Sequence, residues 1–218
     1  MQDDDDQTDW AAILANGQGD NEPDDYILIT PEIVAKISLK DCEEQLWRSI
    51  DDTLRLAQAM KSAHLALHAA LIAALAGSMN IGAHPEGLRV RKLRYYQEGT
   101  GERPDSDRVM SFDELLKKAM NSPLEWTGQP LTLDPHERDL LARLSRLRDG
   151  IEHPKQAHWG IEIAYILEVL PLAARTTVKL LEVVAHHLEP GELFDLRTLS
   201  EGVEAICRNI QKITGGER

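Results

Sequence analysis

The sequence predicts an all-α protein, a bundle of four to six amphipathic helices. From Asp41 onward, apolar residues recur at the three- and four-residue spacing that places them on one face of a helix. Aromatic residues make up only 5% of the 218-residue chain, which disfavours sandwiches and barrels because their strands rely on aromatic side chains. Helical stripes of this kind are buried by packing against one another, so we expect an up-and-down bundle.

An acidic segment precedes the helices. Residues 1–32 contain ten Asp and Glu and no Lys or Arg, so the rest of the chain carries only −3 of the formal net charge of −13. A like-charge block with few large apolar side chains stays solvated. We therefore predict a disordered acidic tail over residues 1–30 and one domain over residues 31–218. The tail is either a solubilising segment or a partner-binding or RNA-mimicking arm, with an apolar patch from Trp10 to Leu14.

The composition indicates a cytoplasmic protein that does not span a membrane. The chain begins without the basic and apolar regions of a secretory signal. Its longest apolar stretch, His64 to Ala76, carries two histidines and is too short for a span. Two cysteines, Cys42 and Cys207, are too few for a disulfide framework, so we expect a reducing compartment.

The first helical segment is predicted to begin at Asp41. Asp41 and Glu44, three residues later, form the pattern of a capping box. No Gly or Pro follows before Gly77, so residues 41–76 are either one long helix or two with a break near Lys61–Ser62. Residues 78–110 are rich in Gly, Pro and charged residues, which predicts a long loop insertion.

Local signals place the later helices. Ser111 begins a capping-box pattern, and Asp134 is followed by proline and then by glutamate, which predicts a second helix start. That second helix should end at His153, because the residue before a proline avoids the α region. We expect the next helix to be kinked or broken at Pro171 and a C-terminal helix to span residues 198–214.

Most enzyme and cofactor signatures are missing from the sequence. It contains no P-loop, no glycine-rich dinucleotide turn, no nucleophile elbow, and neither HExxH nor CxxC, so we expect no cofactor and no metal. His64 and His68 have the four-residue spacing of two metal ligands, but no carboxylate follows to complete a site. His64 also lies on the apolar stripe, so we expect these side chains in the core or at its rim.

The segment from Arg143 to Glu162 combines a cationic and a titratable side chain near a helix end. Arg148 continues the leucine stripe of its helix, and a guanidinium on that face needs an acceptor because burying an unpaired charge is costly. His153 follows five residues later. The local alternative is that Arg148 pairs with Glu152 and Asp149 holds His153, each at i,i+4 spacing.

A second basic cluster lies in the predicted insertion. The stretch RVRKLRYY alternates bases with aromatics, and such a segment can bind an RNA strand by charge and stacking. The alternative is an ordinary solvated loop. The candidate RNA-binding residues in this stretch are Arg91, Lys92, Arg94 and Tyr95. Lys155, two residues after His153, is a fifth candidate.

The Arg/His motif and its flanks resemble the HEPN superfamily of bacterial and archaeal all-α domains. Members carry an Arg, four to six arbitrary residues and then a His, with a polar residue often following the Arg. Arg148, Asp149 and His153 match this pattern. The run LRDGIEHP followed by WGIE is similar to a set of uncharacterised bacterial HEPN-like proteins with LRNxxxH and a Trp-(Ser/Gly)-Ile-Glu segment. The resemblance covers roughly residues 40–190.

The resemblance implies an HEPN-like helical bundle and a metal-independent endoribonuclease that cleaves RNA by 2′-OH transesterification at a homodimer interface. In that chemistry His153 would handle protons, Arg148 would stabilise the transition state, and Asp149 would orient His153 or seat the substrate. The implied setting is a toxin–antitoxin or phage-defence system. The implied partners are a second copy of the chain, RNA, and an antitoxin or other protein.

Two positions depart from the family pattern. Asp149 stands where many members have Asn or His. Lys155 stands where the toxin branch partnered by nucleotidyltransferase antitoxins has Tyr, so control by tyrosine adenylylation is not expected. Many HEPN domains are catalytically silent, and the alternative function is a helical module that binds a protein or nucleic-acid partner. A third is a sensor that binds a small molecule or nucleotide in the bundle cleft.

Overall fold

The computed structural model describes residues 29–104, 106–153 and 160–215. The predictions for the acidic tail up to residue 28, for its patch from Trp10 to Leu14 and for Lys155 concern residues outside these ranges. The described ranges contain seven α-helices, one 3₁₀ turn and no strand, which confirms the all-α prediction. The elements are α2 (Pro31–Arg48), α3 (Arg55–Ala76), α4 (Glu86–Glu98), α5 (Phe112–Asn121), α6 (Pro135–Glu152), α7 (Ile163–Val183), η1 (Ala185–His187) and α8 (Glu192–Gly215).

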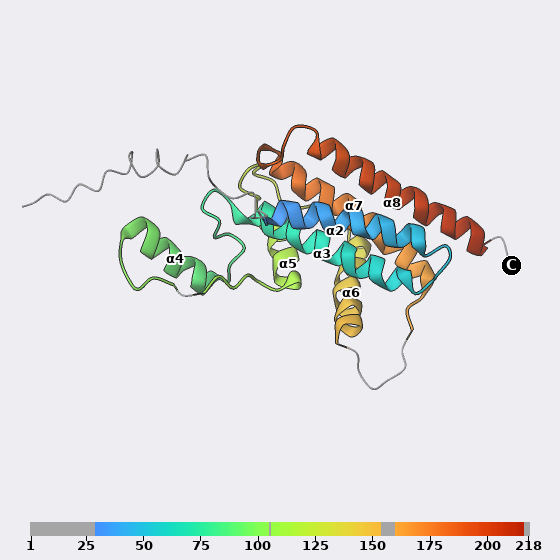
Figure 1. The fold of residues 1–218 in the computed structure, drawn as a ribbon. Coiled ribbons are helices and arrows are strands. Elements are labelled where there is room, and N and C mark those ends of the chain that lie inside the picture. The colour runs from blue at the N-terminus through green and yellow to red at the C-terminus, as the bar shows by residue number, and fades with distance from the viewer. Residues whose placement is uncertain (1–28, 105, 154–159, 216–218) are drawn as a thin grey trace, which may run out of the picture.

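Four helices form the bundle that carries the core (Figure 1). α2 and α3 are an antiparallel hairpin, as are α7 and α8, and α3 packs against α7 while α2 packs against α8. α5 and α6 lie against this bundle through α3, and α6 also contacts α7. The centre of the core consists of fully buried leucines on α3 and α7, among them Leu67, Leu71, Leu170 and Leu180.

By length and composition, α3 is apolar enough to cross a membrane. Most of its apolar stretch is buried among the other helices, as in the core helix of a bundle. Its alanines, which include Ala63, Ala66 and Ala70, are small enough to let the neighbouring helices approach closely. The apolar composition of α3 is therefore accounted for by its central place in the bundle.

The predicted start of the first helix at Asp41 is wrong. α2 begins ten residues earlier, at Pro31, with Thr30 as its N-cap, and the Thr30 Oγ1 accepts a backbone N–H at 3.3 Å. Asp41 lies inside α2, where its carboxylate accepts hydrogen bonds from Gln45 and from Ser62 on α3. The carboxylate that looked like a helix cap therefore links the two helices of the hairpin.

The alternative of two helices for this region is confirmed, but they part at residues 49–54 rather than near Lys61–Ser62. The Ser49 hydroxyl donates to the Leu46 carbonyl at 2.7 Å at the end of α2. Asp52 then accepts the N–H of the residue before α3 at 3.1 Å. Side chains that hydrogen-bond to nearby backbone compete with the helix, so these two polar residues interrupt it without Gly or Pro.

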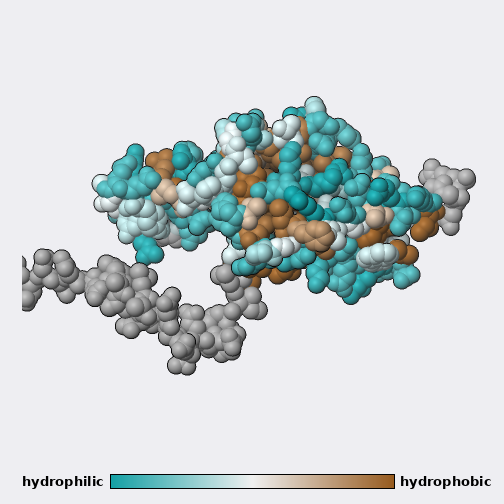
Figure 2. Space-filling view, turned by 90° about the horizontal axis from the view of Figure 1, so that it is seen from above, coloured by the Kyte–Doolittle hydropathy of each residue, from teal (hydrophilic) through white to brown (hydrophobic). Residues whose placement is uncertain are grey.

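The predicted loop over residues 78–110 contains a helix, so that prediction is wrong in part. α4 follows Pro85 and ends at Gly99, whose left-handed backbone (φ 63°) favours glycine. Only Leu88 and Lys92 are buried on α4, so it lacks the apolar stripe that identifies a helix in sequence. We refer to residues 86–104 and 106–108 as the arm. The arm stands beside the bundle and its surface is largely hydrophilic (Figure 1; Figure 2).

Other helix ends agree with the local signals. Ser111 starts α5 and Asp134 starts α6, each with a complete capping box, and α6 ends with His153 as its C-cap. α7 continues through Pro171, so the predicted break is absent. The tertiary packing of α7, which is buried along most of its length, maintains the helix across the hydrogen bond that proline removes.

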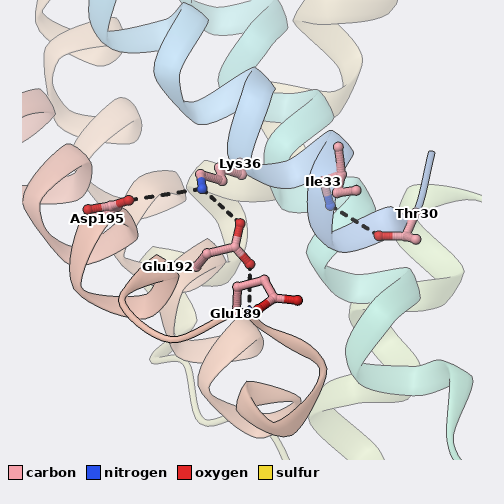
Figure 3. A network of polar contacts seen from close by, with 6 residues as sticks. All are labelled: Thr30, Ile33, Lys36, Glu189, Glu192 and Asp195. Carbon is pink, nitrogen blue, oxygen red and sulfur yellow. Dashed lines mark hydrogen bonds and ion pairs between the residues drawn. The ribbon is translucent and has the colours of Figure 1, made fainter. Parts of the chain in front are cut away.

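The last helix is longer than predicted, because α8 begins at Glu192 instead of residue 198. Lys36 on α2 donates to the Glu192 carboxylate at 2.8 Å and lies 4.0 Å from Asp195 (Figure 3). The Glu192 carboxylate also accepts the Glu189 N–H at 2.9 Å. These contacts stabilise the first turn of α8 against α2, which a local capping signal does not reveal.

Candidate functional site

The second half of α6 carries the Arg/His motif. Leu141 and Leu144 are fully buried, and Tyr165 on α7 donates its hydroxyl proton to the Leu140 carbonyl at 3.0 Å, which sets the position of α6 on the bundle. The opposite face of α6 is exposed. It carries five polar side chains at spacings of three or four residues: Asp139, Arg143, Arg146, Asp149 and His153.

Arg148 on α6 forms ion pairs with two carboxylates of the same helix. Its side chain is 25% exposed, and its Nη1 lies 2.9 Å from Asp149 Oδ1 and 3.0 Å from Glu152 Oε2. On α3, Lys61 Nζ lies 3.6 Å from the other oxygen of Glu152. The guanidinium has thus found the acceptors that its place on the helix requires, and both are on its own helix.

His153 stands exposed at the end of α6. Its backbone N–H donates to the Asp149 carbonyl at 2.9 Å, which closes the last turn. Within the described residues no hydrogen bond joins the Asp149 carboxylate to the His153 ring, because that carboxylate faces Arg148. His153 is five positions after Arg148, which is about 7.5 Å along the helix axis. Of the two local pairs that the spacing allowed, the described contacts include Arg148 with Glu152 and not Asp149 with His153.

Two imidazoles on α3 lie close enough to Arg148 for its charge to act on their pKa values. His64 is 2% exposed, and its ring centroid is 4.5 Å from that of Phe112 and 5.9 Å from that of His68. Neither ring nitrogen of His64 has a hydrogen-bond partner among the described residues. Burial, together with the nearby Arg148 cation, lowers the pKa of His64 to about 3, and the same two causes lower the pKa of His68. Both rings are therefore neutral at pH 7.

The placement of His64 in the core was predicted from its stripe, but its proximity to Arg148 was not. The contact is tertiary, since α3 and α6 meet only in the folded bundle, and no spacing in the sequence links the two residues. In the part of the chain that the structure describes, no three His, Cys, Asp or Glu side chains are grouped so that they could bind a metal ion.

The candidate RNA-binding residues of the arm have different surroundings. Arg91 and Arg94 are exposed and Tyr95 is half-buried on α4. Lys92 is 7% exposed and donates to His84 Nε2 at 3.0 Å and to Asp107. His84 in turn donates from Nδ1 to the Arg108 carbonyl at 2.7 Å. Lys92 therefore connects α4 to the chain on either side of it, while the neighbouring arginines face solvent.

Comparison with known proteins gave no match to a family model, a curated protein or a solved structure. What the site can do is therefore argued from its own residues. It offers a cation positioned by two carboxylates and, one and a half turns later, a solvent-accessible imidazole. This combination suits an anionic substrate that undergoes proton transfer.

Proposed function

We propose that this chain is a metal-independent endoribonuclease of the HEPN type, which cleaves RNA at a site formed by two copies of the chain. The observation that carries the proposal is that Arg148 and His153 both belong to the C-terminal end of α6 in an all-α bundle, where Arg148 is partly exposed and His153 is exposed. The choice of RNA as substrate rests on the resemblance of this segment to HEPN proteins.

The reaction requires two proton transfers and the stabilisation of added negative charge. The 2′-oxygen of a ribose attacks the adjacent phosphorus as its proton leaves to a base, the phosphorus–O5′ bond breaks, and an acid protonates the leaving oxygen. The products are a 2′,3′-cyclic phosphate and a 5′-hydroxyl. Imidazole serves as base or acid near neutral pH, and His153 takes this role. The Arg148 fork donates to the phosphoryl oxygens as their charge increases.

For Arg148 to bind a phosphate, one of its carboxylate partners must give way. The Asp149 side chain is 61% exposed and the Glu152 side chain only 27% exposed. Exposed ion pairs contribute only about 0–1 kcal/mol, so the pair with Asp149 is the easier one to exchange. A phosphate would therefore displace Asp149 from the guanidinium, while Glu152 keeps the guanidinium in position.

A second copy of the chain completes the site. One chain supplies a single exposed imidazole at the end of α6, whereas the acid and the base act on opposite sides of the phosphorus. The exposed face of α6 bears charges of both signs, which suits pairing of two copies about a twofold axis. Light scattering after size exclusion should show a dimer at micromolar concentration, and a monomer would contradict a composite site.

The alternative is a catalytically silent helical module that binds a protein or nucleic-acid partner. The specific observation in its favour is the pairing of Arg148 with both Asp149 and Glu152, which satisfies the cation without a ligand. In this alternative the motif residues stabilise the end of α6, and the exposed face of that helix contacts the partner.

Cleavage of single-stranded RNA in excess EDTA tests the proposal. We expect His153→Ala and Arg148→Ala each to lower the cleavage rate by at least about 100-fold, the usual contribution of a proton-transfer group and of a donor that stabilises transition-state charge. The matched controls are His136→Ala and Arg138→Ala, near the start of the same helix, which should cleave at the wild-type rate. Equal activity of the wild type and both site variants would contradict the proposal. Absence of cleavage by the wild type would favour the silent module.

A further inference from the structure

The arm contains a pocket whose lining includes three arginines. Its volume is about 490 Å³, and its wall includes Arg91, Arg94 and Arg103 together with Glu102 and the turn at Thr100 and Gly101. Pockets of this size accept a group as large as a nucleotide. We refer to it as the arm pocket.

Local backbone geometry brings the three guanidiniums together. Arg91 and Arg94 are three residues apart and therefore share one side of α4. The chain then reverses through Gly99 (φ 63°) and Gly101 (φ 87°), left-handed conformations that L side chains rarely adopt. This turn returns Arg103 to the side of α4 that carries the first two arginines.

The acidic side chains that the structure describes around the arm pocket form no ion pairs with its three arginines. Arg89, elsewhere on α4, forms a two-bond ion pair with Glu86, and Lys92 is paired with Asp107. None of the three pocket arginines makes an ion pair with a residue that the structure describes. Glu102 is the one acidic residue in the described wall, so the pocket has an excess of positive charge.

We propose that the arm pocket binds phosphate groups of a single-stranded RNA, with Arg91, Arg94 and Arg103 as the phosphate ligands. The planar guanidinium donates two parallel hydrogen bonds to a phosphate, so three of them around one pocket suit a phosphodiester backbone. Tyr95 follows Arg91 by one helical turn and lies half-buried on the same side of α4, where its ring can stack on a base. The choice of RNA rests on the proposed function. The arm pocket deepens that function, because it binds the strand away from the Arg148 site.

Binding is measured apart from cleavage by fluorescence anisotropy with a labelled 2′-O-methyl RNA, which lacks the hydroxyl that transesterification needs. Arg91→Ala, Arg94→Ala and Arg103→Ala should each weaken binding about 3- to 10-fold. Each should also reduce the slope of log Kd against log salt by about 0.7, the value for one phosphate contact on a single strand. Arg89→Ala, on the same helix but paired with Glu86, is the matched control and should stay within twofold of the wild type.

Two further measurements separate the possible failures. His153→Ala should bind the 2′-O-methyl RNA as the wild type does, so a loss of cleavage with retained binding concerns only the Arg148 site. Inorganic phosphate should compete with the RNA in the wild type and less in Arg94→Ala. The inference would be overturned if all three pocket variants bound RNA as tightly as the wild type does. This holds even if those variants no longer bind inorganic phosphate.

Discussion

Arg148 and the arginines of the arm pocket differ in what surrounds them. Arg148 lies against the bundle, touches two carboxylates of its own helix and has neutral imidazoles behind it. Arg91 and Arg94 on α4 and Arg103 after the end of that helix form no ion pair with a described residue. The comparison teaches that the charge of a motif residue can be paired with carboxylates in the fold, while basic residues outside the motif stay free of such pairs within the described residues and can bind an anionic ligand.

The two regions also differ in what keeps them folded. Around Arg148, α3 and α6 pack through buried apolar side chains, so the site depends on the stability of the whole bundle. The arm has only two buried residues on its helix, and polar contacts of Lys92 connect it to the adjoining chain. Regions with few buried apolar contacts open locally at lower free-energy cost. Substitutions near Arg148 should therefore change the stability of the whole bundle, whereas substitutions in the arm should change only the local stability of the arm.

The largest expected effect concerns acid stability of the bundle beside Arg148. The pKa of His64 is about 3 in the folded chain and near 6.5 when unfolded, so the unfolded chain binds a proton first as the pH falls. Stability from this residue is complete above about pH 6.5 and decreases toward pH 3. Between pH 7 and pH 5 the loss should be about 2 kcal/mol at 1.36 kcal/mol per pH unit.

Chemical denaturation at pH 7 and pH 5 measures this loss. His64→Leu removes the buried imidazole without leaving a polar group unpaired. Between pH 7 and pH 5 its free energy of unfolding should therefore decrease by about 2 kcal/mol less than that of the wild type. His186→Ala, which removes an exposed imidazole, is the control and should respond to pH as the wild type does. Identical responses of the wild type and His64→Leu would show that His64 does not sense acid.

A smaller effect is expected when Arg148 loses the less exposed of its carboxylates. Glu152→Gln weakens the contacts with both Arg148 and Lys61, and should lower the free energy of unfolding by about 0.5–1 kcal/mol, since the pair is partly exposed. The same change should increase RNA affinity at the Arg148 site, because the cation is less neutralised. Glu44→Gln, in an exposed i,i+4 pair with Arg48, is the matched control and should change stability by less than about 0.5 kcal/mol. An unchanged affinity together with lower stability would mean that Arg148 is a structural residue only.

Helix ends formed by side chain–backbone chemistry could be predicted from the sequence. Ser111, Asp134 and His153 are where their neighbours in sequence place them, because a cap is a contact between residues three or four apart. α4 escaped prediction because it has no apolar stripe, and the break at Ser49 did so because it contains neither Gly nor Pro. These elements depend on polar contacts that the apolar pattern does not encode.

The candidate site was predictable to a similar extent. The sequence places Arg148 and His153 near one helix end and offers Glu152 as a partner, because all three are within two turns of α6. It does not reveal that the charge of Arg148 acts on His64, since the two residues come near each other only when α3 and α6 pack together. The return of Arg103 to α4 likewise depends on the backbone of the turn after the helix.

The smallest effect on overall stability is expected in the arm. Lys92→Met keeps the length of the side chain but removes the hydrogen bonds to His84 and Asp107, and it leaves His84 Nε2 without its donor. Because the buried Lys92 then no longer connects α4 to the adjoining chain, amide exchange over residues 86–98 should accelerate at least about tenfold. Exchange in the buried parts of α3 and α7 should stay unchanged, as should exchange throughout the arm in the control Arg89→Met, whose ion pair lies within α4. Faster exchange spread evenly over arm and bundle would mean that the two regions unfold as one unit, and the comparison between them would then fail.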